Sequence, residues 1–127
     1  MTKVSQVLAK EVDLLCARMK RYQFDDLAHY TTWSSQHYYL IQNTPRFLHL
    51  CCGTIHPDNA ELFEEFSQHL KEELHHDSML EKDMAALDYD VRSSEPLPPT
   101  MSIIALQDFY IRRFGAITFL AYGLVLE

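Results

Sequence analysis

The chain has 127 residues, of which 47% are hydrophobic and 23% charged, and its formal net charge at pH 7 is -7. This balance excludes a disordered chain, and acidic charge without a basic cluster excludes nucleic acid and anionic membrane surfaces as partners. Only three glycines and long proline-free stretches predict an all-α fold. The length predicts a single domain, residues 1–127.

No targeting segment is recognisable at the N-terminus, and the longest apolar run, residues 114–126, is too short to cross a bilayer. The three cysteines are Cys16 and the adjacent pair Cys51 and Cys52, without Cys-x-x-Cys spacing. An odd count of this kind suits a reducing compartment better than a disulfide framework. We therefore predict a cytoplasmic protein in which Cys51 and Cys52 pack in the core.

Apolar spacing predicts a first helix over residues 5–21 and a second from residue 25 or 26 to about residue 40. Thr44 and Pro45 then predict a new helix start, a cap followed by proline at the first helical position. Gly53 is expected to end this short third helix as a C-cap. The inward side chains expected on the first two helices are Val4, Leu8, Val12, Leu15 and Met19, then Tyr30, Trp33, His37 and Leu40.

A long fourth helix is predicted over residues 58–87. Asp58, with Glu61 three residues later, resembles a capping box at its start. Steps of three and four residues along this segment hold one face towards the core. The expected inward positions are Leu62, Phe66, His69, Glu73, His76, Leu80, Met84 and Leu87.

Residues 89–99 contain three prolines and predict a semi-rigid connection. Thr100 is expected to cap a fifth helix that runs to the end of the chain. Because residues 114–126 are apolar on every side, this helix is expected to be buried all round. Either the chain is the N-terminal part of a longer protein, or a second copy covers the surface in a homodimer. The expected inward stripe is Ile103, Leu106, Tyr110, Ile117, Leu120 and Leu124.

Two overlapping Glu-x-x-His pairs occur in the fourth segment, and only Glu73 and His76 fall on the inward stripe. Glu72 and His75 are expected to face water. A buried carboxylate without a partner is costly, so Glu73 needs compensation. We favour a metal ion, because helix bundles hold non-haem iron or manganese with this spacing. The alternative is a buried salt bridge or hydrogen bond from Glu73 to an arginine or tyrosine.

Three further kinds of candidate accompany this pair. His69 lies one turn before Glu73 and is expected to support the ligands by hydrogen bonding, with a metal ligand or a core histidine as the alternatives. Glu127, at the end of the fifth helix, is a second candidate carboxylate ligand. His29 and His37 are candidate axial ligands for haem iron, with a hydrogen-bonded core histidine as the alternative for either.

Several segments together resemble the iron-containing redox enzyme family, the haem-oxygenase-like dimetal oxidases and oxygenases. They are residues 44–48 (TPRFL), residues 69–77 (HLKEELHHD) with Met79, Leu80 and Asp83 after them, and residues 122–127 (YGLVLE). The last segment is similar to a Gly/Tyr-rich family segment that ends in a ligand glutamate. The resemblance covers most of the chain from about residue 36.

The resemblance implies an all-α, haem-oxygenase-like (TenA/PqqC-like) helical bundle, incomplete at its C-terminus. It implies Glu73, His76 and Glu127 as metal ligands, and iron as cofactor, two ions in a complete site, with manganese as the alternative metal. Dioxygen and a small organic substrate would be the partners. The family's remaining ligands form a His-x3-Asp-x2-His pattern that this sequence lacks, so the chain would supply at most half of a two-metal site.

Three other functions stay open at this point. One is a metal-free enzyme on the same bundle, like the thiaminase or cofactor-maturation relatives, in which Glu73 would act in acid–base chemistry. The second is haem binding through His29 or His37. The third is a helical dimerisation module without catalytic activity.

Overall fold

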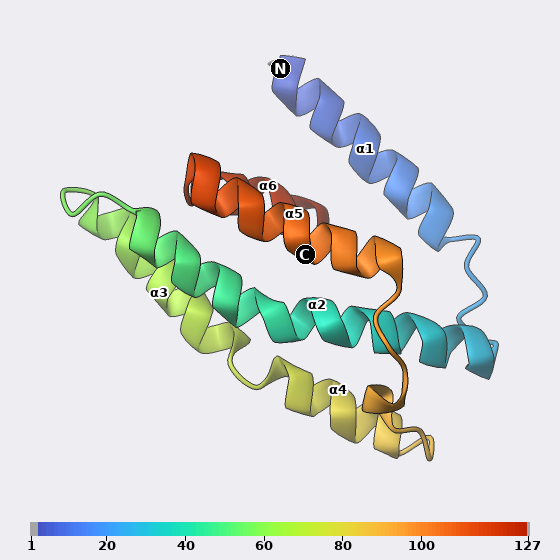
Figure 1. Cartoon of the computed structure of the whole chain (residues 1–127). Helices are drawn as coiled ribbons and strands as arrows, with labels where there is room; N and C mark the ends of the chain where they lie inside the picture. Colours follow the sequence, from blue (N-terminus) through green and yellow to red (C-terminus); the bar gives the residue numbers. More distant parts are fainter. Residues whose placement is uncertain (1–2, 127) are drawn as a thin grey trace. The chain divides into compact units, whose positions relative to one another are not determined.

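The computed structural model describes residues 3–126, with the backbone alone at positions 4 and 124–126. Every regular element in this range is a helix, which confirms the all-α prediction. No helix of the described chain is both long and apolar enough to span a membrane. The elements are α1 (Lys3–Met19), α2 (Leu27–Thr54), α3 (Ala60–Glu73), α4 (His76–Ala85), the 3-10 helix η1 (Val91–Ser93), α5 (Pro98–Phe114) and α6 (Ile117–Leu126) (Figure 1).

The chain divides into two compact units, Met1–Tyr30 and Thr31–Glu127. The first unit holds α1 and the first residues of α2. Asp26 caps α2, because its Oδ1 accepts a hydrogen bond from the backbone N–H of His29 at 2.9 Å. The Tyr22 hydroxyl donates to the His29 carbonyl at 2.9 Å and ties the preceding turn to the helix. The predicted start of the second helix at residue 25 or 26 is therefore confirmed to within two residues.

The helix α2 is one continuous helix where the sequence predicted two. Pro45 lies inside it, and the Thr44 hydroxyl donates to the Leu40 carbonyl at 3.2 Å instead of capping a new helix. Interior proline costs a helix about 3 kcal/mol. Phe47 and Leu48, directly after the proline, are fully buried, and burial of such side chains contributes about 1.5–3 kcal/mol each. Tertiary packing thus outweighs the local break.

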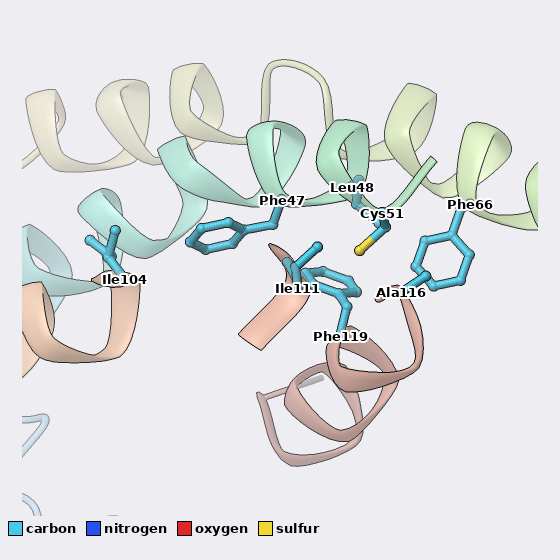
Figure 2. Packing of buried hydrophobic residues seen from close by; sticks show 8 residues of the cluster. All are labelled: Phe47, Leu48, Cys51, Phe66, Ile104, Ile111, Ala116 and Phe119. Atoms are coloured by element: carbon cyan, nitrogen blue, oxygen red, sulfur yellow. The ribbon is translucent and has the colours of Figure 1, made fainter. Parts of the chain in front are cut away.

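The core of the second unit lies where α2, α3, α5 and α6 meet (Figure 2). In Figure 1, α2 lies between α5 on one side and the successive helices α3 and α4 on the other. Cys51 is buried in this core, and desolvation raises the pKa of its thiol to about 12. The prediction that Cys51 packs in the core is confirmed. The buried cluster comprises Phe47, Leu48, Cys51, Phe66, Ile104, Ile111, Ala116 and Phe119.

Polar side chains of α2 hold the proline-rich connection between α4 and α5. The Gln36 Oε1 accepts hydrogen bonds from the Leu97 N–H at 2.7 Å and from the Thr100 hydroxyl at 2.8 Å. The Tyr39 hydroxyl donates to the Ser94 carbonyl at 2.6 Å. These bonds order the segment that the sequence predicted as a semi-rigid connection.

Four predicted helix ends differ from the structure. Gly53 does not end a helix as a C-cap, because α2 continues to Thr54. The N-cap of α3 is Asn59, without a side-chain capping bond, so Asp58 does not form a capping box. The helix α5 begins at Pro98, and Thr100 lies in its first turn. Gly115, at φ 85° and ψ −175°, separates α5 from α6, so the predicted fifth helix is two helices. Such a conformation strongly favours glycine, which explains the break at this position.

The apolar stripe predicted to be inward on α5 is exposed. Ile104 and Ile111 are buried instead, together with the polar side chains of Thr100 and Gln107. The helix therefore carries two neighbouring stripes, and the one that packs in the core contains polar residues that an apolar pattern overlooks. Burial on every side is likewise wrong for α6, since Ile117 and Leu120 are exposed.

Candidate functional site

The predicted helix over residues 58–87 is broken between Glu73 and His76. Leu74 is extended, and His75 takes a left-handed conformation at φ 75°, so α3 ends at Glu73 and α4 begins at His76. A positive φ is uncommon outside glycine, although histidine adopts it more often than most residues. Neither residue is glycine or proline, so the local sequence does not signal this break.

Contacts of α4 with α2 account for the change of direction. The Tyr38 hydroxyl donates to Glu81 Oε1 at 2.6 Å, and Arg92 Nη2 donates to Glu81 Oε2 at 2.9 Å. Met84, one turn after Glu81, is fully buried. These tertiary interactions favour the bend, which leaves Glu73 and His76 facing each other at the junction of the two helices.

The Glu73 carboxylate lies between two imidazoles at this junction. Its Oε2 is 2.9 Å from His76 Nδ1, and its Oε1 is 3.4 Å from His69 Nε2. The Glu73 side chain is 15% exposed, against 31% for His69 and 43% for His76. Both contacts join the carboxylate to histidines, and they are ion pairs when the imidazoles are protonated. His69 also meets Phe119 edge to face at 6.2 Å.

Glu73 and His76 open onto a small cavity of about 200 Å³. Ligand pockets are commonly 300–1,000 Å³, so this cavity suits an ion with a few small ligand atoms better than a large cofactor. Both residues line this pocket, although the single helix predicted to carry them is broken between them. The cavity is lined by His37, Leu40, Ile41 and Thr44 of α2, by Glu73 and His76, and by Tyr122 of α6.

His37 contributes a second imidazole to this cavity from α2. Burial lowers its pKa, so the ring is neutral near pH 7. Its ring stacks on Trp33 with centroids 4.8 Å apart and an interplanar angle of 13°. The sequence placed His37 on an inward stripe but did not pair it with Glu73, and no sequence signal identified Tyr122 or Thr44 as lining residues. His29 lies in the other unit with its side chain 51% exposed.

The second Glu-x-x-His pair serves as an internal comparison. Glu72 and His75 are exposed, as predicted, and Glu72 Oε1 accepts a hydrogen bond from Gln68 at 2.9 Å. A wider hollow of about 730 Å³ runs along this side of α3. All its lining residues come from that single helix, whereas the smaller cavity is lined by residues of several helices.

The donor atoms at the small cavity match the chemistry of a metal site in part. Carboxylate and imidazole ligands suit ferrous iron, and carboxylates also suit manganese. Within residues 3–126, however, no group of three or more His, Cys, Asp and Glu side chains is arranged to hold a metal ion. Glu127, the predicted third ligand, lies outside the described residues. Two of the predicted donors therefore reach the cavity, and a complete coordination set is not formed by the described residues.

No protein-family model, curated protein or solved structure matches the chain. Function is therefore inferred from the chemistry of the cavity and its surroundings.

Proposed function

We propose that the chain is the metal-binding part of a non-haem iron-dependent oxidase or oxygenase that acts on a small organic substrate, with Glu73 and His76 as ligands. One observation carries the proposal: a largely buried carboxylate and a partly exposed imidazole line the same half-open pocket of about 200 Å³. A carboxylate in such a place is stabilised by a cation that shares the cavity. Glu127 is the proposed further ligand.

The surrounding side chains have separate roles in this proposal. His69 holds Glu73 Oε1 and thereby orients the carboxylate, as hydrogen-bonding partners of metal ligands commonly do. Leu40 and Ile41 form apolar walls that exclude water from the cavity. When bound, iron would supply a coordination position for dioxygen and electrons to reduce it.

Metal content tests the proposal directly. The full chain is reconstituted anaerobically with ferrous iron or manganese, desalted, and analysed by plasma mass spectrometry. We expect bound metal above background, with a loss of about tenfold or more in affinity for Glu73→Gln and His76→Gln, in the range that metal-site substitutions produce. Absence of binding above background in the unsubstituted chain would contradict the proposal.

The exposed pair provides matched control variants with the same spacing. Glu72→Gln and His75→Asn should leave metal binding unchanged, because both side chains face solvent. Asparagine is chosen at position 75 because it tolerates the positive φ of 75°. Equal losses in the exposed and the cavity-facing pairs would show that the cavity is not the binding site.

A metal-free acid–base enzyme is the second candidate. The 2.9 Å contact between Glu73 Oε2 and His76 Nδ1 is the arrangement in which a carboxylate orients an imidazole for proton transfer. Exposure of the ferrous protein to dioxygen separates the two candidates. An absorption change that is lost in Glu73→Gln supports the oxidase, whereas a protein that binds no metal and gives no change supports acid–base chemistry.

A further inference from the structure

Large exposed apolar side chains occur on α5 and in the first turns of α6. These side chains, here called the α5–α6 apolar surface, are between 42% and 67% exposed. Phe109 and Tyr110 have ring centroids 5.6 Å apart, and Tyr110 stacks with Phe114 at 5.9 Å, so the aromatic rings adjoin. The surface comprises Ile103, Leu106, Phe109, Tyr110, Phe114, Ile117 and Leu120.

The spacing of these residues shows that the surface is separate from the core. Ile103, Leu106, Tyr110 and Phe114 follow one another by three, four and four residues, which is a single stripe along a helix. The core-facing stripe of the same helix is a different one and includes Ile104 and Ile111. One helix thus presents two apolar stripes, of which only one packs within its unit.

The exposed area is of the size that a stable dimer needs. Large apolar side chains offer on the order of 150–250 Å² each, so seven that are about half exposed present roughly 600–800 Å². Specific interfaces bury about 800 Å² per partner. The largest apolar patch of a typical monomer is about 300–600 Å², so this surface is large for a chain that stays alone in solution.

The chain carries a net charge of -7, but acidic side chains add little charge to this surface. The one acid of α5, Asp108, is held by Arg112 Nε and Arg46 Nη1, each at 2.7 Å, and the surface therefore bears no uncompensated negative charge. Arg113 lies over the Phe114 ring at 5.4 Å. Aromatic residues with arginine and few acids are the composition of interface centres.

We propose that the α5–α6 apolar surface is a homodimer interface. Two copies related by a two-fold axis perpendicular to α5 would place their stripes in antiparallel register, so that each exposed stripe covers the other. This arrangement closes on itself and leaves no further copy of the surface to extend the assembly.

Sedimentation equilibrium of the full chain over a wide concentration range tests the proposal. We expect a dimer, and Leu106→Glu or Phe114→Glu should raise its dissociation constant by about 100-fold or more, because each substitution acts twice across a two-fold interface. Both side chains are more than half exposed in the single chain, so the helical circular dichroism should be unchanged. Met79→Glu on α4, at a side chain 62% exposed, is the matched control and should remain dimeric.

A monomeric unsubstituted chain at the highest concentration would overturn the proposal. The same conclusion would follow if Leu106→Glu stayed dimeric, or if Met79→Glu dissociated the dimer equally.

Discussion

The replacement of Pro45 by alanine tests whether α2 is one helix or two. In a helix interior, proline is about 3 kcal/mol less favourable than alanine, because it lacks the N–H that would bond the carbonyl four residues earlier and its ring crowds that carbonyl. Proline also restricts the unfolded chain, an effect of about 0.4–1 kcal/mol that the substitution removes. The structure places Pro45 inside α2 and half-buried. Pro45→Ala should therefore raise the free energy of unfolding by about 2–2.6 kcal/mol.

The effect is measured by urea unfolding followed by circular dichroism, and it corresponds to a rise in Tm of roughly 7–10 °C for a chain of this length. Pro98→Ala is the matched control, because Pro98 opens α5 at a position where proline is well tolerated. That variant should change stability by less than about 0.5 kcal/mol. Equal effects at the two positions, or destabilisation by Pro45→Ala, would refute the continuous helix.

Two further predictions concern ionisable groups that fasten α2 to its neighbours. Burial and the hydrogen bond to Glu81 raise the pKa of Tyr38 from 10.0 to about 12. Its contribution to stability is therefore complete below pH 10.0 and is lost as the pH rises from 10.0 to about 12. In ultraviolet titration Tyr38→Phe should remove the last tyrosine to ionise, and it should cost about 1.5–3 kcal/mol in stability at neutral pH. The hydrogen bond from Arg112, with further attraction from Arg46, lowers the pKa of Asp108 below 3.8. Asp108 therefore contributes stability above pH 3.8 that is lost as the pH falls through the lowered pKa. In unfolding measurements at a series of pH values, Asp108→Asn should remove this part of the acid dependence. Stability at still lower pH should not change.

Helical periodicity predicted the fold class and the inward face of the candidate site, because both depend on local spacing. Phe66 and Met84 are buried and Glu73 is largely so, as their positions on the stripe predicted. The same reasoning failed where distant contacts decide the outcome. The break at His75 follows from the contacts that α4 makes with α2, which no local pattern reveals.

The errors on α2 and α5 have related causes. Thr44 and Pro45 have the residue types of a helix start, and only the burial of Phe47 and Leu48 keeps the helix continuous. On α5 the large apolar residues lie on the exposed stripe. The prediction followed the spacing of these residues and therefore selected the wrong face. The proposed dimer offers a physical reason, since a surface that packs against a second copy would carry the same apolar signal as a core.

The cavity itself was predictable only in part. Glu73 and His76 were found because they interrupt an apolar stripe, which is a local signal. His37 could be placed on its own helix face but not opposite Glu73, because that relation depends on how α2 packs against α3 and α4. Long-range packing thus determined the site beyond its first two residues.

The central claim is that a divalent metal binds beside Glu73, at the cavity formed with His37 and His76. Titration of substoichiometric Mn²⁺ into the protein, observed through the ring signals of its seven histidines by NMR, measures this directly. Paramagnetic broadening should appear first at His37, His69 and His76 and should be lost in Glu73→Gln. Broadening that begins at the exposed His29 and His56, or that is uniform across all the histidines, would contradict the account.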